Sequence, residues 1–69
     1  FDVDVRLLQL FHAIFRNGSI TKAAASLNIG QPAASIGLNK LRSHFSDQLF
    51  VRVGNHMAAT DITKELAPM

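Results

Sequence analysis

The sequence predicts a mainly α fold of three helices, followed by a short two-stranded β hairpin and the start of a fourth helix. Apolar residues recur at three- and four-residue steps within 5–17, 20–27 and 31–45, the period of helices that bury one face. A β-branched and aromatic run at 49–53 precedes a Gly-Asn turn, which is typical of a hairpin. A helix-capping pair follows at Thr60-Asp61. We expect residues 1–59 to form one domain and residues 60–69 to begin a further helix.

The first helix is expected over residues 5–17. Its apolar stripe is predicted to consist of Val5, Leu8, Phe11, Ile14 and Phe15, with Leu7 at the edge. Asp2 and Asp4 lie near its start, where carboxylates favour the positive end of the helix dipole. Asn17-Gly18 ends it, because glycine is the usual residue just beyond a helix.

A second, short helix is expected over residues 20–27, with Ser19 as its N-cap. Residues 28–30 form a three-residue connector. Asn28 tolerates the left-handed backbone that a tight turn requires, and Ile29 is expected to fill the core beneath the turn.

The third helix is expected over residues 31–45. Pro32 lies in its first turn, where the missing N–H costs nothing. The apolar stripe continues through Ala34, Leu38, Leu41 and Phe45, whereas Ser35, Ile36, Asn39 and Lys40 are predicted to point away from it. Gly37 is unexplained by this pattern, since glycine inside a helix costs about 1 kcal/mol relative to alanine.

The hairpin is expected to pair residues 49–53 with residues 56–59 across the turn at Gly54-Asn55. Thr60-Asp61 then caps the fourth helix, on which Ile62 and Leu66 share a face.

Composition excludes several classes of protein. A chain of 69 residues with 48% hydrophobic and 17% charged residues is one small folded domain rather than a disordered segment. No apolar run approaches the ~18–20 residues of a membrane helix, and the absence of cysteine excludes disulfides and thiolate metal sites. The chain starts without methionine and ends just after a new helix begins, so we expect a fragment of a longer protein.

Positive charge is concentrated in the middle of the chain. The net charge is +2, but residues 20–53 carry four cations, Lys22, Lys40, Arg42 and Arg52, against Asp47 alone. This region is the candidate for contact with a polyanion, although the charge by itself favours a merely solvated surface.

The second and third helices have the proportions of a helix-turn-helix. Ala24 permits the two helices to cross closely, and Leu27, Ile29 and Ala34 set the crossing angle. Such a pair projects the start of its second helix, a geometry that suits the ~12 Å wide major groove of B-DNA.

Polar residues of suitable size lie at that projecting end. Gln31 and Ser35 can exchange hydrogen bonds with base edges, while Thr21 and Lys22 can meet phosphates. Arg52, on the hairpin, either enters a minor groove or holds a phosphate, or it forms a salt bridge with Asp47.

Two other functional classes, an enzyme and a protein–protein interaction module, differ from DNA binding in the residues they require. Catalysis would have to use His12, His44 or His56, which lack any metal-ligand or nucleophile spacing, so we expect neither an enzyme nor a metal site. A protein–protein module without DNA binding is the runner-up, with Ile36 and Met57 as its exposed apolar residues.

The sequence resembles the N-terminal winged helix-turn-helix domain of LysR-type bacterial transcriptional regulators. The resemblance covers nearly the whole chain. It is carried by Leu7–Phe11, Gly18–Ala24, Leu27, Gln31–Ser35, Leu41, Leu49–Arg52 and Thr60. Leu41-Arg42, Phe45, Asp47 and the run 49–54 look most like the branch that contains the nodulation regulators.

The resemblance implies sequence-specific binding of double-stranded DNA, with the third helix in the major groove and the wing near the minor groove. The DNA-binding residues it implies, together with the outward positions of the third helix, are Thr21, Lys22, Gln31, Pro32, Ser35, Ile36, Asn39 and Arg52. It also implies that residues 60–69 begin a linker helix pairing two subunits of a dimer or tetramer. The whole protein is then a bacterial, cytoplasmic, nucleoid-associated protein. No cofactor is expected in this domain, and a small-molecule effector would bind a later domain.

The chain departs from the family pattern at four positions. Gly30 replaces the usual serine and removes a side-chain cap and a phosphate contact. Ile36 stands where a basic or polar residue is common, so a polar contact with base or phosphate is reduced there. Ala59 and Thr63 alter the exit of the wing and the start of the linker helix.

Overall fold

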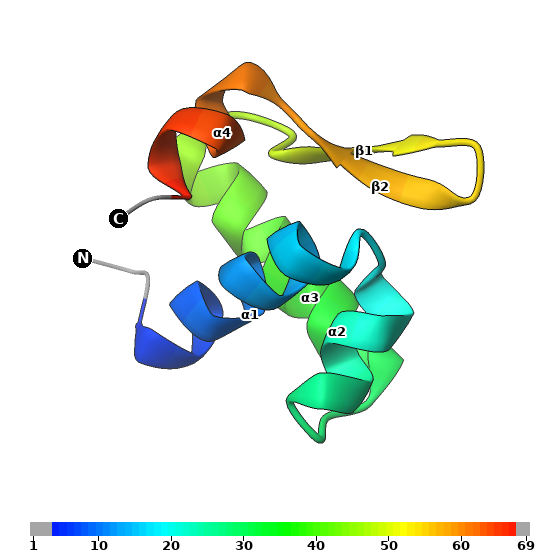
Figure 1. Ribbon diagram of the computed structural model, residues 1–69. Coiled ribbons are helices and arrows are strands. Elements are labelled where there is room, and N and C mark those ends of the chain that lie inside the picture. The colour runs from blue at the N-terminus through cyan, green and yellow to red at the C-terminus, as the bar shows by residue number, and fades with distance from the viewer. Residues whose placement is uncertain (1–3, 68–69) are drawn as a thin grey trace.

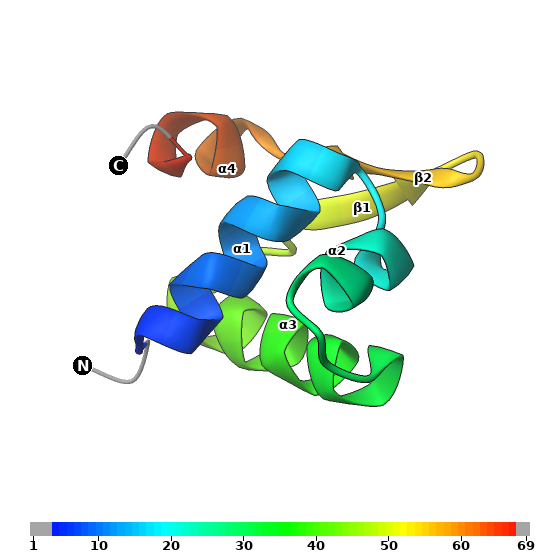
Figure 2. The ribbon, with the colours of Figure 1, turned by 60° about the horizontal axis from the view of Figure 1, so that its bottom comes forward.

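The computed structural model describes residues 4–67, which form four helices and one two-stranded antiparallel sheet. The elements are α1 (Val5–Asn17), α2 (Ile20–Ser26), α3 (Gln31–Phe45), β1 (Phe50–Val53), β2 (His56–Ala59) and α4 (Asp61–Leu66). Helices α1, α2 and α3 pack against one another, and the hairpin extends beyond them with its tip on the same side as α2 (Figures 1 and 2). The mainly α fold predicted from the sequence is confirmed. The contribution expected from Asp2 lies outside the described residues.

The expected helix boundaries are set by local capping. Asp4 caps α1 by accepting a hydrogen bond from the amide of Leu7 at 3.0 Å, and Gly18 ends that helix with φ 64°. Ser19 caps α2 by accepting from the amide of Lys22 at 3.2 Å. Asn28 adopts φ 57° in the connector, the left-handed conformation predicted for it. Turn chemistry therefore explains where these helices begin and where α1 ends, whereas α2 ends at Ser26, one residue earlier than expected, with Leu27 as its C-cap.

The face that α1 buries differs from the predicted stripe. Leu10, Phe11 and Ile14 are buried, whereas Val5 is 68% exposed and Leu8 and Phe15 also face solvent. Apolar residues lie on more than one side of this helix, so the sequence pattern was compatible with burying either of two faces. Packing against α2, α3 and β2 selected the side of Leu10 rather than that of Leu8.

Gly37 permits the close packing of α1 on α3. A Cβ atom at this position would lie 2.6 Å from Cδ2 of Leu10 and 3.3 Å from Cδ2 of Leu7. These separations are too short for carbon atoms, which prefer about 3.5–4.0 Å. Glycine at this position lowers the helix propensity of α3 but permits α1 and α3 to approach closely.

Ile29 does not fill the core as expected, because its side chain is 40% exposed. Its amide donates to the carbonyl of Ala24 at 3.0 Å, so the backbone of Ile29 belongs to the turn. The side chain lines a shallow hollow with Arg6, Gln9 and Leu27. The fully buried alanines of α2 and α3 already close the space between those helices.

The hairpin starts one residue later than predicted because Leu49 adopts φ 65°. Leu49 is fully buried, and its amide donates to Oδ2 of Asp47 at 2.8 Å. Its carbonyl accepts from Oγ1 of Thr63 at 2.6 Å and from the amide of Thr60 at 2.9 Å. A positive φ is uncommon for leucine, and these bonds hold it in place.

Thr63 is the buried polar residue of α4. Its hydroxyl bonds to Leu49 and satisfies its only hydrogen, so the departure from a small residue at this position is accommodated by a specific contact. Thr60 caps α4 as expected by accepting from the amide of Thr63. Ile62 instead faces solvent.

Candidate nucleic-acid interface

The start of α3 projects from the surface of the domain. Gln31, Pro32 and Ala33 are exposed, and burial begins at Ala34. Gly30 occupies the N-cap position with extended backbone and supplies no side-chain cap, as its lack of a side chain requires. The first turn of α3 therefore presents side chains and free backbone N–H groups to solvent.

Gln31 and Ser35 are joined by a hydrogen bond in the free domain. Nε2 of Gln31 lies 3.2 Å from Oγ of Ser35, one helical turn away. This bond uses one amide hydrogen, so the carbonyl oxygen of Gln31 and the hydroxyl hydrogen of Ser35 stay available. The pair offers an acceptor and a donor with their directions already restricted.

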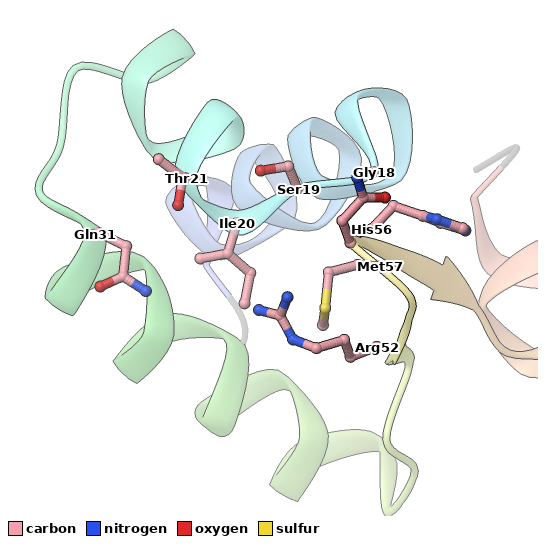
Figure 3. Close-up of a pocket in the computed structure, with 9 residues that line it drawn as sticks. Gly18, Ser19, Ile20, Thr21, Gln31, Arg52, His56 and Met57 are labelled. Carbon is pink, nitrogen blue, oxygen red and sulfur yellow. The ribbon is translucent and has the colours of Figure 1, made fainter.

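A pocket of about 180 Å³ separates the start of α2 from the hairpin. Thr21 and Gln31 reach it from the helices and Arg52 from β1 (Figure 3). The amide of Met57 donates to the carbonyl of Gly18 at 2.8 Å and ties the hairpin to the turn before α2. The predicted site residues Thr21, Gln31 and Arg52 thus converge on one concave surface.

Arg52 has no hydrogen-bond or ion-pair partner within residues 4–67, and its guanidinium reaches towards the α2–α3 side of the pocket (Figure 3). Its alternative partner, Asp47, instead accepts from the amide of Leu49 and from the hydroxyl of Thr60, both at 2.8 Å. The salt bridge considered from the sequence is not formed. Within the described residues the guanidinium of Arg52 is exposed to solvent.

Arg42 has a different role from the one its charge suggested. Its Nε donates to the carbonyl of Gln48 at 2.8 Å, and its Nη2 donates to the carbonyl of Phe50 at 2.9 Å. Arg42 is therefore not part of a merely solvated surface, because this half-buried side chain joins α3 to β1. Sequence spacing gave no sign of these bonds, since both acceptors are backbone atoms.

Four other predicted site residues are exposed and lie outside the pocket, as does the half-buried Ser35. Lys22 is on α2, and Pro32, Ile36 and Asn39 follow the outer face of α3. The backbone amide of Lys22 is already bonded to Ser19, so any contact by Lys22 must use its ammonium group.

The alternative sites weigh less in the structure. Within residues 4–67, no cluster of three or more metal-ligating side chains occurs. His12 is half-buried with its ring 5.5 Å from that of Phe11, and Met57 is half-buried against the core rather than exposed. No helix in the described part of the chain is long and apolar enough to cross a membrane.

Six of the nine residues that line the pocket were not predicted as site residues, and two of them are exposed polar residues of the hairpin. Asn55 and His56 border it from the hairpin turn and β2. The sequence predicts Asn55 as part of the turn and His56 as the start of the second strand, and neither prediction indicates a place in the site. The hydrogen bond from the amide of Met57 to the carbonyl of Gly18 holds this end of the hairpin beside Gly18 and Ser19.

Comparison with protein families gives a match over residues 5–63 to the model described as bacterial regulatory helix-turn-helix protein, lysR family. Among curated proteins, the chain is 38% identical over 66 residues to nodulation protein D 1 of Rhizobium leguminosarum bv. phaseoli. It is 39% identical to nodulation protein D 3 of Rhizobium meliloti (strain 1021). Each alignment covers 96% of this chain and 21% of the relative, so the chain spans about a fifth of these proteins.

Solved structures show the same fold. A probable transcriptional regulator of Pseudomonas aeruginosa matches with a TM-score of 0.92 and 38% identity, over 96% of this chain and 22% of that one. The BenM DNA-binding domain, solved in complex with catB site 1 DNA, matches with a TM-score of 0.88 and 29% identity. That match covers 96% of this chain and 74% of that one. The winged helix-turn-helix architecture expected from the sequence is confirmed.

Proposed function

Because the chain belongs to the LysR family of bacterial regulatory helix-turn-helix proteins, we propose that it binds double-stranded DNA sequence-specifically through α3 and the hairpin. In this proposal α3 enters the major groove and the hairpin lies near the minor groove. The family consists of regulatory proteins, so the chain is a regulatory domain and not an enzyme.

The observation that carries the proposal is the convergence of Gln31 and Arg52 on one surface from separate elements. Gln31, with Ser35 bonded to it, offers hydrogen-bonding groups suited to a base edge. Arg52 offers an unpartnered cation for the phosphates or the narrow groove beside it. Thr21 borders the same pocket and is proposed to contact the sugar–phosphate backbone, as is the nearby Lys22.

A similar domain solved with DNA supports the same assignment. The BenM DNA-binding domain, 29% identical to this chain, was solved in complex with its catB site DNA. We propose the corresponding mode for this chain, with Pro32, Ile36 and Asn39 facing the groove alongside Gln31 and Ser35.

The rest of the protein is also a matter of proposal. Because the chain spans about a fifth of its curated relatives, we propose that the natural protein continues into an effector-binding domain. We propose that α4 begins a linker helix that pairs subunits, and that residues 1–59 form the DNA-binding domain. No cofactor is proposed for this domain. The protein is proposed to act in the bacterial cytoplasm, in association with the nucleoid.

Salt dependence of duplex binding tests the proposal. The logarithm of the binding constant should fall linearly with the logarithm of salt concentration, by about 0.9 per phosphate contact. Fluorescence anisotropy with a labelled random duplex measures this slope. If the chain instead bound a protein partner, and that binding did not change with salt or with competing duplex, the protein–protein interaction module would be supported. Of the two apolar residues expected to be exposed for such a module, Ile36 is exposed and Met57 is half-buried.

Base reading is tested with the double variant Gln31→Ala, Ser35→Ala. Its preference for a selected site over random duplex should fall, since each good base contact is worth ~1–3 kcal/mol, while most nonspecific affinity should remain. The control is Gln9→Ala with Ser26→Ala, which removes the same residue types from exposed positions on α1 and α2. Equal loss on both duplexes would show that Gln31 and Ser35 do not read bases.

A further inference from the structure

Ile36 lies at the centre of the exposed face of α3. The buried residues of this helix are Ala34, Gly37, Leu38 and Leu41. At about 100° per residue, Pro32, Ile36 and Asn39 occupy the opposite side. Ile36 is 59% exposed, one turn beyond Pro32 and directly after Ser35.

The fold makes no use of the Ile36 side chain. Ile36 belongs neither to the buried core nor to the partly buried residues packed against it. Isoleucine is also a poorer helix former than alanine, lysine or glutamate, which suit an exposed helix position better. A single exposed isoleucine is ordinary on a protein surface. Its position beside the hydrogen-bonded pair Gln31–Ser35 is what gives it meaning.

The chemistry of the major groove restricts what isoleucine can read there. The side chain neither donates nor accepts hydrogen bonds, so it cannot satisfy the polar edges of a G·C pair. The apolar group that a base pair presents in this groove is the C5-methyl of thymine. A polar base edge placed against isoleucine would lose its hydrogen bonds to water and gain none in return. Isoleucine therefore disfavours other bases at this position in addition to favouring thymine.

We propose that Ile36 reads the methyl group of a thymine, next to the base pair contacted by Gln31 and Ser35. This inference rests on the proposed function, since it requires α3 to lie in the major groove. The β-branched side chain is stiff at χ1 and loses little rotamer freedom on contact, unlike an arginine or lysine at the same position. Its reading is therefore by shape and hydrophobicity rather than by charge.

A protein partner fits this residue less well. The exposed neighbours of Ile36 towards the C-terminal end of α3, Asn39 and Lys40, are polar, whereas Pro32 and Ala33 on its N-terminal side are small or apolar. A docking helix needs a continuous apolar stripe at three- and four-residue steps. No such stripe surrounds Ile36, because Asn39 and Lys40 interrupt it towards the C-terminal end of α3.

Deoxyuridine substitution tests the proposal, because it removes only the thymine methyl. With the natural protein that carries this chain, duplexes are first selected from a random pool. Each thymine of the selected site is then replaced in turn by deoxyuridine. At the thymine facing Ile36, affinity should fall about fourfold, the equivalent of ~0.8 kcal/mol for one methylene-sized apolar group.

The variant Ile36→Ala should lose this sensitivity, and Ile36→Val should keep most of it. Lys40→Ala, at a neighbouring exposed position of α3, is the matched control and should respond to deoxyuridine as the natural protein does. A second readout is 5-methylcytosine placed opposite guanine at the same position, which should bind more tightly than cytosine only when residue 36 is isoleucine or valine.

Three results would overturn the inference. Deoxyuridine could have no effect at any thymine, its effect could be equal in Ile36→Ala, or Ile36→Ala could leave every duplex affinity unchanged. Failure of the proposed function has a separate signature, since the natural protein would then show no salt-dependent affinity for unmodified duplex.

Discussion

The two ends of α3 have opposite surroundings although they belong to one helix. At the C-terminal end, Leu41 is fully buried and Arg42 donates two hydrogen bonds to the backbone leading into β1. At the N-terminal end, Gln31 is exposed and bonded only to the hydroxyl of Ser35. One end anchors the helix to the domain and the other end is open to a partner.

The same contrast separates Arg42 from Arg52. Both are cations of the positively charged middle of the chain, yet Arg42 is half-buried with two carbonyl partners and Arg52 has none within the described residues. Charge alone therefore does not identify a DNA contact. The hydrogen-bond donors of the cation must also be free of partners within the fold. We expect stability effects at the anchored end and binding effects at the open end.

The largest effect is expected from Leu41→Ala at the anchored end. Removing a fully buried leucine side chain should lower the free energy of unfolding by about 2–5 kcal/mol, measured by urea denaturation of the domain. Ile36→Ala is the matched apolar control on the exposed face and should change stability by less than about 0.5 kcal/mol. Similar losses in both variants would contradict the assignment of the two faces.

Arg42→Ala should lower the free energy of unfolding by about 1–2 kcal/mol. The substitution removes two hydrogen bonds made by a charged side chain, one exposed and one partly buried. Because solvent weakens both, each contributes less than the ~1.5–3 kcal/mol typical of a hydrogen bond to a charged group. Lys40→Ala, an exposed cation two residues away, serves as the control. The contrast would fail if Arg42→Ala left urea stability unchanged and reduced the salt slope of DNA binding instead.

Arg52→Ala should have the reverse profile. Affinity for all duplexes should fall and the salt slope should flatten by about one unit, because a phosphate or groove cation is lost. Stability should remain within about 0.5 kcal/mol, since no internal partner of the guanidinium is removed. Salt titrations by anisotropy, alongside urea denaturation, measure both quantities. An unchanged slope would remove Arg52 from the interface.

The smallest effect is expected from Gly30→Ser at the open end. Gly30 has φ −73°, and an added Cβ would meet only Cδ of Pro32, at an ordinary 3.6 Å. The serine hydroxyl can cap the start of α3, which should raise the free energy of unfolding by a few tenths of a kcal/mol. A gain in affinity that disappears at high salt would indicate a new phosphate contact. Destabilisation would show that the backbone at Gly30 needs glycine.

Local signals in the sequence determined where the elements lie. Ser19, Asn28 and Thr60 act through hydrogen bonds or backbone angles within a few residues, so their roles could be predicted without the fold. Gln31, Ser35 and Arg52 were predicted from the proportions of the helix-turn-helix, the hairpin and the family resemblance, and the structure brings Gln31 and Arg52 to one pocket. Whether these residues contact DNA stays a prediction.

The tertiary structure decided what each side chain is left to do. Packing determined which face of α1 is buried, because apolar residues occupy two faces of that helix. Packing also explains Gly37, since a Cβ atom there would collide with the side chain of Leu10. In the folded domain Arg42 donates hydrogen bonds to two backbone carbonyls, whereas Arg52 has no partner among the described residues. Periodicity and capping depend on neighbours in the chain, and so the sequence reveals them. Hydrogen-bond partners distant in the chain become neighbours only when the helices and the hairpin pack together.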